Sequence, residues 1–203
     1  MKDYLKTFHE SFQDLKINTN AELGFCCHKE ILGELRQRLI SMQQRHSQVF
    51  VIMMSVLFPA GYATAAGNEL FTRFLADFIR HERSAYGDVE YVWRFEREND
   101  DSMGHWHVVL YYNANVVQGS FVHRISAEKY WAKMLDVDSA VGRIHVSEPK
   151  SGLSYRHDGF KLRRGDTELD KVRNDCFSWI SYVAKFRPNI VAEKNKSYGC
   201  SQL

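Results

Sequence analysis

Two neighbouring stretches of the chain decide the fold: Val89-Glu-Tyr-Val-Trp-Arg-Phe-Glu-Arg-Glu98 and His105-Trp-His-Val-Val-Leu-Tyr-Tyr-Asn113. Both are rich in the β-branched and aromatic residues that favour strands. The polar segment Asn99–Gly104 separates them, which indicates a β-hairpin with a long loop. Because side chains alternate across a strand, His105 and His107 share one face of this hairpin.

The segments around this hairpin alternate between strand and helix patterns. The run from Val49 to Phe58 is apolar almost throughout, as in a strand that is buried on both faces. Asn68 precedes a broad apolar stripe at helical spacing, and Pro188 ends a similar pattern. The sequence therefore predicts an α+β fold, with a central, mainly antiparallel β-sheet flanked by helices. The other expected elements are a helix capped by Ser126, a strand over Gly142–Ser147 and a helix over Leu169–Arg187.

Two amphipathic helices are expected before the first strand, joined near Thr19–Gly24. Apolar residues recur at helical spacing on both sides of this junction, at Leu5, Phe8, Phe12 and Leu15 and again at Ile31, Leu35, Leu39 and Met42. We expect residues 1–203 to form a single domain, with a helical N-terminal segment over 1–47 and the core over 48–190.

The composition is that of a soluble globular protein. Hydrophobic residues make up 44% of the chain and charged residues 26%, which argues against disorder. The longest apolar run is too short to span a bilayer, so we expect no membrane partner and a cytoplasmic location. The four cysteines form no CxxC pair, which indicates reduced thiols. The net charge of +2 permits a nucleic-acid partner without requiring one.

His105 and His107 are the candidate metal ligands. Two imidazoles on one strand face can bind a divalent cation, and a carboxylate across the hairpin would complete a set with open positions for a substrate oxygen. Glu96 is our choice for this ligand, with Glu98 on the same strand face as the competitor. A bare HxH pair also arises by chance on amphipathic strands, and His145 could border such a site. A cupin-like barrel using this strand is disfavoured, because helices separate the strands.

Tyr182 is the candidate nucleophile. In a continuous helix Tyr182 and Lys185 would be neighbours on one face, and the ammonium would favour the reactive phenolate. Tyr182 lies at the edge of the apolar stripe, from which it could reach a cleft. With 10 tyrosines in the chain, the pattern around Tyr182 taken alone favours a packing role over a catalytic one.

Together these motifs resemble the HUH endonuclease superfamily, specifically the inovirus-type rolling-circle replication initiators. The resemblance rests on Tyr91-Val-Trp-Arg-Phe-Glu96, Gly104-His-Trp-His107 and Trp179-Ile-Ser-Tyr182-Val-Ala-Lys185, and Asp158–Asp166 also looks similar. It extends over about Val49 to Arg187. One tyrosine occupies the catalytic turn, so the match is to single-tyrosine members.

The resemblance implies an HUH/RRM-like palm and a site-specific DNA nicking endonuclease. Mg²⁺ or Mn²⁺ would bind His105, His107 and Glu96, while Tyr182 would attack the phosphate and form a 5′-phosphotyrosine link. Lys185 would stabilise charge or activate the tyrosine. Such a nickase would initiate replication of a mobile genetic element, or would be carried by a phage satellite to nick a competing phage genome. The alternative is a non-cleaving origin-binding module with the same fold.

A basic and aromatic segment before the last helix is the candidate DNA-binding surface. Cations for phosphates and rings for bases are typical of a single-stranded path, although a solvated basic loop fits the pattern equally well. The expected partner is single-stranded or supercoiled DNA with an origin-like site. Because the chain has no Walker motif, a helicase would act in trans. The predicted DNA contacts are Arg156, Lys161, Arg163 and Arg164, interleaved with Tyr155 and Phe160, together with Arg187 at the end of the last helix.

Overall fold

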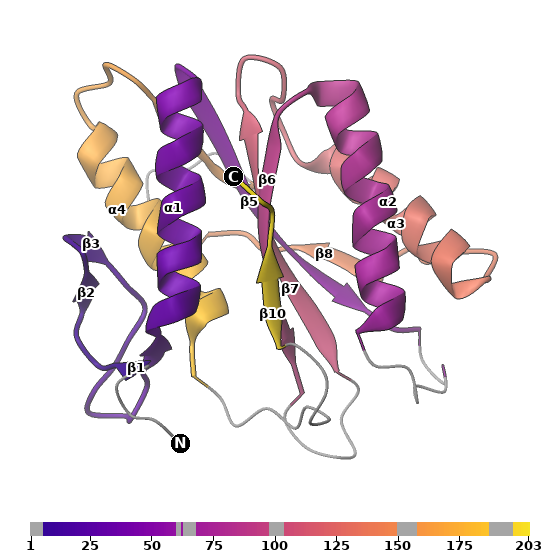
Figure 1. Cartoon of the computed structure of the whole chain (residues 1–203), viewed down its shortest axis with the longest axis horizontal. Helices are drawn as coiled ribbons and strands as arrows, with labels where there is room; N and C mark the ends of the chain where they lie inside the picture. Colours follow the sequence, from indigo (N-terminus) through magenta and orange to yellow (C-terminus); the bar gives the residue numbers. More distant parts are fainter. Residues whose placement is uncertain (1–5, 60–61, 63–67, 98–103, 150–157, 187–196) are drawn as a thin grey trace.

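The computed structural model describes residues 6–59, 62, 68–97, 104–149, 158–186 and 197–203 (Figure 1). Several residues named in the sequence-based predictions lie outside the described residues: Leu5, Glu98, Tyr155, Arg156 and Arg187. No helix among the described residues has both the length and the hydropathy needed to cross a membrane.

A six-stranded sheet forms the centre of the fold, and every pairing in it is antiparallel. The strand order is β10-β6-β7-β5-β8, with β9 also paired to β5. The prediction of an α+β fold with a central antiparallel sheet is therefore confirmed. The strands are β5 (Gln48–Leu57), β6 (Val89–Glu96), β7 (His105–Asn113), β8 (Ile144–Val146), β9 (Phe160–Arg163) and β10 (Tyr198–Cys200).

Helices cover both faces of this sheet. Figure 1 shows α1 (Lys29–Arg45) and α4 (Leu169–Ile180) on one face, with α2 (Glu69–Tyr86) and α3 (Phe121–Leu135) on the other. Alternate residues of each strand enter two separate hydrophobic clusters: Val92 and Val109 pack with α1 and α4, whereas Trp106 packs with α2 and α3. The predicted burial of β5 on both faces is confirmed, because Val49 through Met54 are all buried.

Trp106 anchors the face that carries α2 and α3. Its ring nitrogen donates a hydrogen bond of 2.8 Å to Asn68 Oδ1, and its ring stacks on Phe71 with centroids 4.6 Å apart. Asn68 precedes α2 as expected, but its side chain makes no capping hydrogen bond. That side chain accepts the bond from Trp106 instead, and pairing with β5 and β6 sets the direction of His105 and His107.

The prediction of a helix through Leu5–Leu15 is wrong. Residues 6–28 form two small antiparallel pairs: β1 (Lys6–Thr7) with β4 (Cys27–His28), and β2 (Ser11–Phe12) with β3 (Leu15–Lys16). Gln13 and Asp14 have φ values of 48° and 66°, which a right-handed helix does not allow and a tight turn requires. Leu15 is nevertheless buried in the same cluster as α1 and α4. The second predicted helix is confirmed as α1, and the division at residue 47 stays a prediction.

The last helix is shorter than predicted. α4 ends at Ile180 and continues as the 3₁₀ helix η2 (Ser181–Ala184), after which Lys185 is extended, with φ −58° and ψ 125°. Long-range hydrogen bonds end the helix before Pro188 is reached. Arg94 donates to the carbonyls of Val183 and Lys185, and Phe186 N–H donates to Cys26 O. In the middle of the chain, α3 begins at Phe121, five residues before the expected cap, and the predicted strand over Gly142–Ser147 is confirmed as β8.

Candidate active site

Glu96, His105 and His107 converge at one end of the β6–β7 hairpin. The antiparallel register pairs Glu96 with His105 and Arg94 with His107, which places all four side chains on the sheet face that carries α1 and α4. Nε2 of His107 lies 3.0 Å from Glu96 Oε2 and 3.0 Å from Nε2 of His105. The remaining distance, from His105 Nε2 to Glu96 Oε2, is 4.0 Å.

The orientation of His107 is set by Ser55 on β5. Ser55 is the direct cross-strand partner of His107, and its Oγ lies 3.0 Å from Nδ1 of the imidazole. When Nδ1–H donates to this hydroxyl, the lone pair of Nε2 is directed at Glu96 and His105. Metal-binding histidines are commonly oriented through their second nitrogen in this way. The sequence analysis did not identify Ser55, although a polar residue in a buried strand was a usable signal.

The donor set fits a divalent metal ion. Of the described residues, Glu96, His105 and His107 form the group whose ligand atoms all lie within 4.8 Å of one another. Ligand atoms about 2.1 Å from one ion lie roughly 3 to 4 Å from each other, as these do. The Glu96 and His107 side chains are 6% and 9% exposed, whereas His105 is 27% exposed. The exposed side at His105 leaves access for a substrate.

Tyr182 lies beside this cluster. Its ring is half-buried on η2, with its centroid 5.4 Å from that of His107 and its plane at 89° to the imidazole. Residues 75 positions apart in the sequence are thus in edge-to-face contact. The structure therefore brings together the three predicted ligands and the predicted nucleophile.

Arg94 holds the backbone on which Tyr182 sits. This arginine is 3% exposed, and its Nη1 donates to Val183 O at 3.0 Å and also to Lys185 O. Ser181 adds a second tie, because its Oγ accepts the Asn18 N–H at 2.7 Å and donates to Ser178 O. The sequence analysis missed Arg94. A cation two residues before Glu96, on the face of β6 that carries buried residues, was the available signal.

A family model described as the YagK/YfjJ C-terminal domain matches residues 8–201 of the chain. The chain belongs to this family. No curated protein sequence matches it significantly.

Two solved structures share parts of the fold at low similarity. The catalytic domain of the adeno-associated virus type 5 Rep protein is 7% identical, with a TM-score of 0.37, over 67% of this chain and 96% of that one. The nuclease domain of the minute virus of mice non-structural protein 1 is 13% identical, with a TM-score of 0.35, over 67% of this chain and 79% of that one.

Lys185 directly follows the 3₁₀ helix η2, and its N–H donates to Tyr182 O at 3.0 Å. Its ammonium lies 3.8 Å from the centroid of the Phe25 ring, and its carbonyl accepts from Arg94. The α-helix expected over both residues has ended by Ile180, and the catalytic pairing of Tyr182 with Lys185 stays a prediction. Lys185 is three positions after Tyr182 in the sequence, and its ammonium lies next to the N-terminal segment.

The predicted DNA contacts on β9 lie away from the metal ligands. β9 pairs with Gln48–Val51, whereas His107 pairs with Ser55, a separation of about 13 Å or more along β5. Lys161 donates to Gln118 Oε1 at 2.6 Å, and Arg164 donates to the carbonyls of Gln43, Gln44 and His46 at the end of α1. Arg164 thus caps a helix, while Arg163 is exposed. DNA binding by these side chains stays a prediction.

His145 on β8 is nearer to the cluster. It pairs with Ser55, which in turn pairs with His107, so it lies on the same sheet face two strands away from that ligand.

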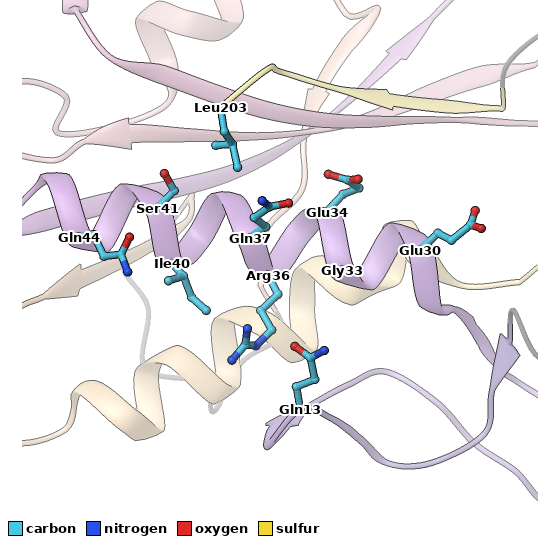
Figure 2. A pocket seen from close by; sticks show the side chains of 10 residues that line it. All are labelled: Gln13, Glu30, Gly33, Glu34, Arg36, Gln37, Ile40, Ser41, Gln44 and Leu203. Carbon is cyan, nitrogen blue, oxygen red and sulfur yellow. The ribbon is translucent and has the colours of Figure 1, made fainter.

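A groove of about 530 Å³ lies elsewhere, along the outer side of α1. Figure 2 shows its lining side chains on α1, with Gln13 from the β2–β3 turn and Leu203 at its edges. The lining contains no histidine, cysteine or tyrosine. This groove is separate from the Glu96–His105–His107 cluster, and its side chains offer no nucleophile comparable to Tyr182.

Proposed function

We propose that this protein is a metal-dependent endonuclease that nicks one strand of DNA through Tyr182. The supporting observation is the contact between the Tyr182 ring and His107, whose Nε2 belongs to a convergent set of three metal-binding atoms. A tyrosine placed against such a set can reach a phosphate whose oxygen is held there. The resemblance of the three sequence motifs to single-tyrosine HUH endonucleases supports the same function.

Glu96, His105 and His107 would hold Mg²⁺ or Mn²⁺. The ion would supply Lewis-acid polarisation of the scissile phosphate and would offset the charge that develops on it. Imidazole is a poor ligand for Mg²⁺, which prefers oxygen, and is better suited to the later divalent metals. We therefore expect Mn²⁺ to bind this set more tightly than Mg²⁺.

Tyr182 would carry the covalent step. Its phenol oxygen loses its proton and forms a bond to phosphorus, while the bond from phosphorus to the 3′ oxygen breaks. The leaving oxygen takes up a proton and becomes a free 3′-hydroxyl, and the 5′ phosphate stays on the tyrosine. Reversal of the same step rejoins the strand. A single tyrosine supports one cleavage and one joining, which favours a plain nickase.

The biological setting in this proposal is a mobile genetic element. The nick would start replication of the element itself or damage a competing phage genome. The substrate would be single-stranded or supercoiled DNA with an origin-like site, and extended unwinding would require a helicase in trans.

The test is a nicking assay on supercoiled plasmids that carry candidate origins, with Mn²⁺ or Mg²⁺ and with EDTA as the metal-free control. We expect open-circle product and a protein–DNA adduct that survives denaturation, both lost in Tyr182→Phe. Tyr130→Phe, a half-buried tyrosine on α3, is the matched control and should behave as the wild type. An adduct that persists in Tyr182→Phe would exclude this nucleophile. Metal and DNA binding without any nick would instead favour the non-cleaving origin-binding module.

A further inference from the structure

Two phenylalanines next to the Tyr182 segment each carry a lysine ammonium over their ring. Lys185 Nζ lies 3.8 Å from the centroid of Phe25, and Lys6 Nζ lies 3.8 Å from that of Phe186. We propose that these four residues, the paired-ring surface, bind the single DNA strand that flanks the scissile phosphate. This inference rests on the proposed function and adds a binding subsite that the sequence motifs did not include.

Backbone pairing builds this surface from three distant parts of the chain. β1 pairs with β4, Cys27 forms a bridge with Lys185, and Phe186 N–H donates to Cys26 O. In Figure 1, β1 and the chain that leaves α4 lie at the same lower end of the view, where β7 begins. Because Lys185 O also accepts from Arg94, whose cross-strand partner is His107, the surface adjoins the candidate metal ligands.

The Phe25 ring is exposed although backbone hydrogen bonds hold its turn in place. It is 40% exposed, whereas Phe71 and Phe160 in the core are fully buried. Two backbone hydrogen bonds close the turn between Asn20 and Phe25, with lengths of 2.7 and 3.1 Å. The ring is thus presented on a closed turn, so binding a base against it costs little additional ordering.

The electrostatic surroundings are positive and suit an anionic chain. The charges of Arg94 and Lys6 act on His28, whose ring is 5.0 Å from that of Phe186, and the charge of Lys185 acts on the adjacent Cys27. Burial and the charges of Arg94 and Lys6 lower the pKa of His28 to about 4. His28 is therefore a neutral ring at physiological pH, and it adds aromatic area to the surface while the lysines supply the charge.

The exposed Phe25 ring and the half-buried Phe186 ring, each with a lysine ammonium over it, match the chemistry of single-stranded DNA. Bases stack on aromatic side chains irrespective of sequence, and phosphates pair with lysines. In a duplex the base faces are stacked on one another and cannot reach a ring on a protein surface. The surface therefore suits a single strand on one side of the phosphate that Tyr182 would attack.

The test measures the binding of a fluorescent, random-sequence single-stranded oligodeoxynucleotide by anisotropy in EDTA. Phe25→Leu retains apolar packing under Lys185 but removes the aromatic face, and we expect about tenfold weaker binding. Phe25→Trp should restore it. The matched control is Phe121→Leu: Phe121 is 63% exposed on α3, over the opposite sheet face, and Arg124 lies 5.4 Å from its ring centroid. It should bind as the wild type.

A second measurement separates charge from stacking. Lys6→Gln should lower the slope of log affinity against log salt by about 0.7, the value for one phosphate contact on a single strand. Lys129→Gln, an exposed lysine on α3, should leave the slope unchanged.

Three outcomes would overturn the subsite. Phe25→Leu could bind the single strand with wild-type affinity, Phe121→Leu could lose as much affinity as Phe25→Leu, or the wild type could fail to bind the single strand. Because this assay contains no metal, it does not depend on cleavage. Loss of binding in Phe25→Leu in a protein that never nicks DNA would refute the proposed nuclease alone. If the wild type nicks DNA and Phe25→Leu binds the single strand as tightly as the wild type does, the subsite alone is refuted.

Discussion

The two faces of the β6–β7 hairpin differ sharply although they are made by alternate residues of the same two strands. One face presents Trp93, Trp106 and Val108 to α2 and α3 and is built from stacked rings. The other presents Arg94 and the three candidate metal ligands, with Tyr182 packed beside them. We call these the apolar face and the polar face. The polar face also contributes Val92 and Val109 to the cluster beneath α1 and α4, and its candidate metal ligands gather where β6 ends and β7 begins. Separate substitutions on the two faces test this division.

The largest effect is expected from Trp106→Ala. Removing a fully buried indole should lower the free energy of unfolding by about 3–5 kcal/mol, and it also leaves Asn68 Oδ1 without its donor. Chemical denaturation measures this loss. His107→Ala, the adjacent residue on the other face, should cost only about 1 kcal/mol without metal. Equal losses in the two variants would contradict the division between the faces.

A bound metal ion should stabilise the folded protein only through the ligands on the polar face. At a free Mn²⁺ concentration of about 100 times Kd, the free energy of unfolding should rise by about 2.7 kcal/mol. Thermal unfolding with and without EDTA measures the rise, which should vanish in His107→Ala. Phe95→Leu, a change on the apolar face of β6, should retain it. A stabilisation that survives in His107→Ala would place the metal elsewhere.

Arg94→Gln should loosen the segment that carries Tyr182. The carbonyls of Val183 and Lys185 lose a charged donor, which should lower the free energy of unfolding by about 2 kcal/mol. We expect faster amide hydrogen exchange in residues 181–186 and slower formation of the covalent adduct. Arg83→Gln is the control, because Arg83 also donates to a strand carbonyl, that of Val89, but from α2. Unchanged exchange in Arg94→Gln would show that η2 does not depend on this arginine.

The smallest effect is a pH dependence from His28. Its pKa in the folded protein is lowered from 6.5 to about 4, so the unfolded chain takes up a proton first as the pH falls. Stability should therefore be complete above pH 6.5 and should fall by about 1 kcal/mol between pH 6.5 and 4, after allowance for solvent screening. Denaturation midpoints across this range should show a shallower decline in His28→Gln. An identical decline in that variant would assign the effect to other groups.

Much of the sheet was predictable because its signals are local. The buried strand from Val49, the β6–β7 hairpin and the sharing of one face by His105 and His107 all follow from side-chain alternation, and the structure has them. The N-terminal helix was predicted wrongly because Leu5, Phe8, Phe12 and Leu15 have helical spacing in a segment that turns at Gln13 and Asp14. There, long-range packing against α1 and α4 outweighs a short periodic pattern.

By itself, the sequence determined β5, β6, β7 and β8, the face on which each side chain of the β6–β7 hairpin lies and the residue types able to bind a metal. A period of two needs only neighbouring residues. Only the tertiary structure decided that Tyr182 contacts His107, that Arg94 holds its backbone and that Lys185 lies over Phe25. These contacts join residues far apart in the chain. Their geometry depends on where α4 ends, and hydrogen bonds from β6 and the N-terminal segment set that end.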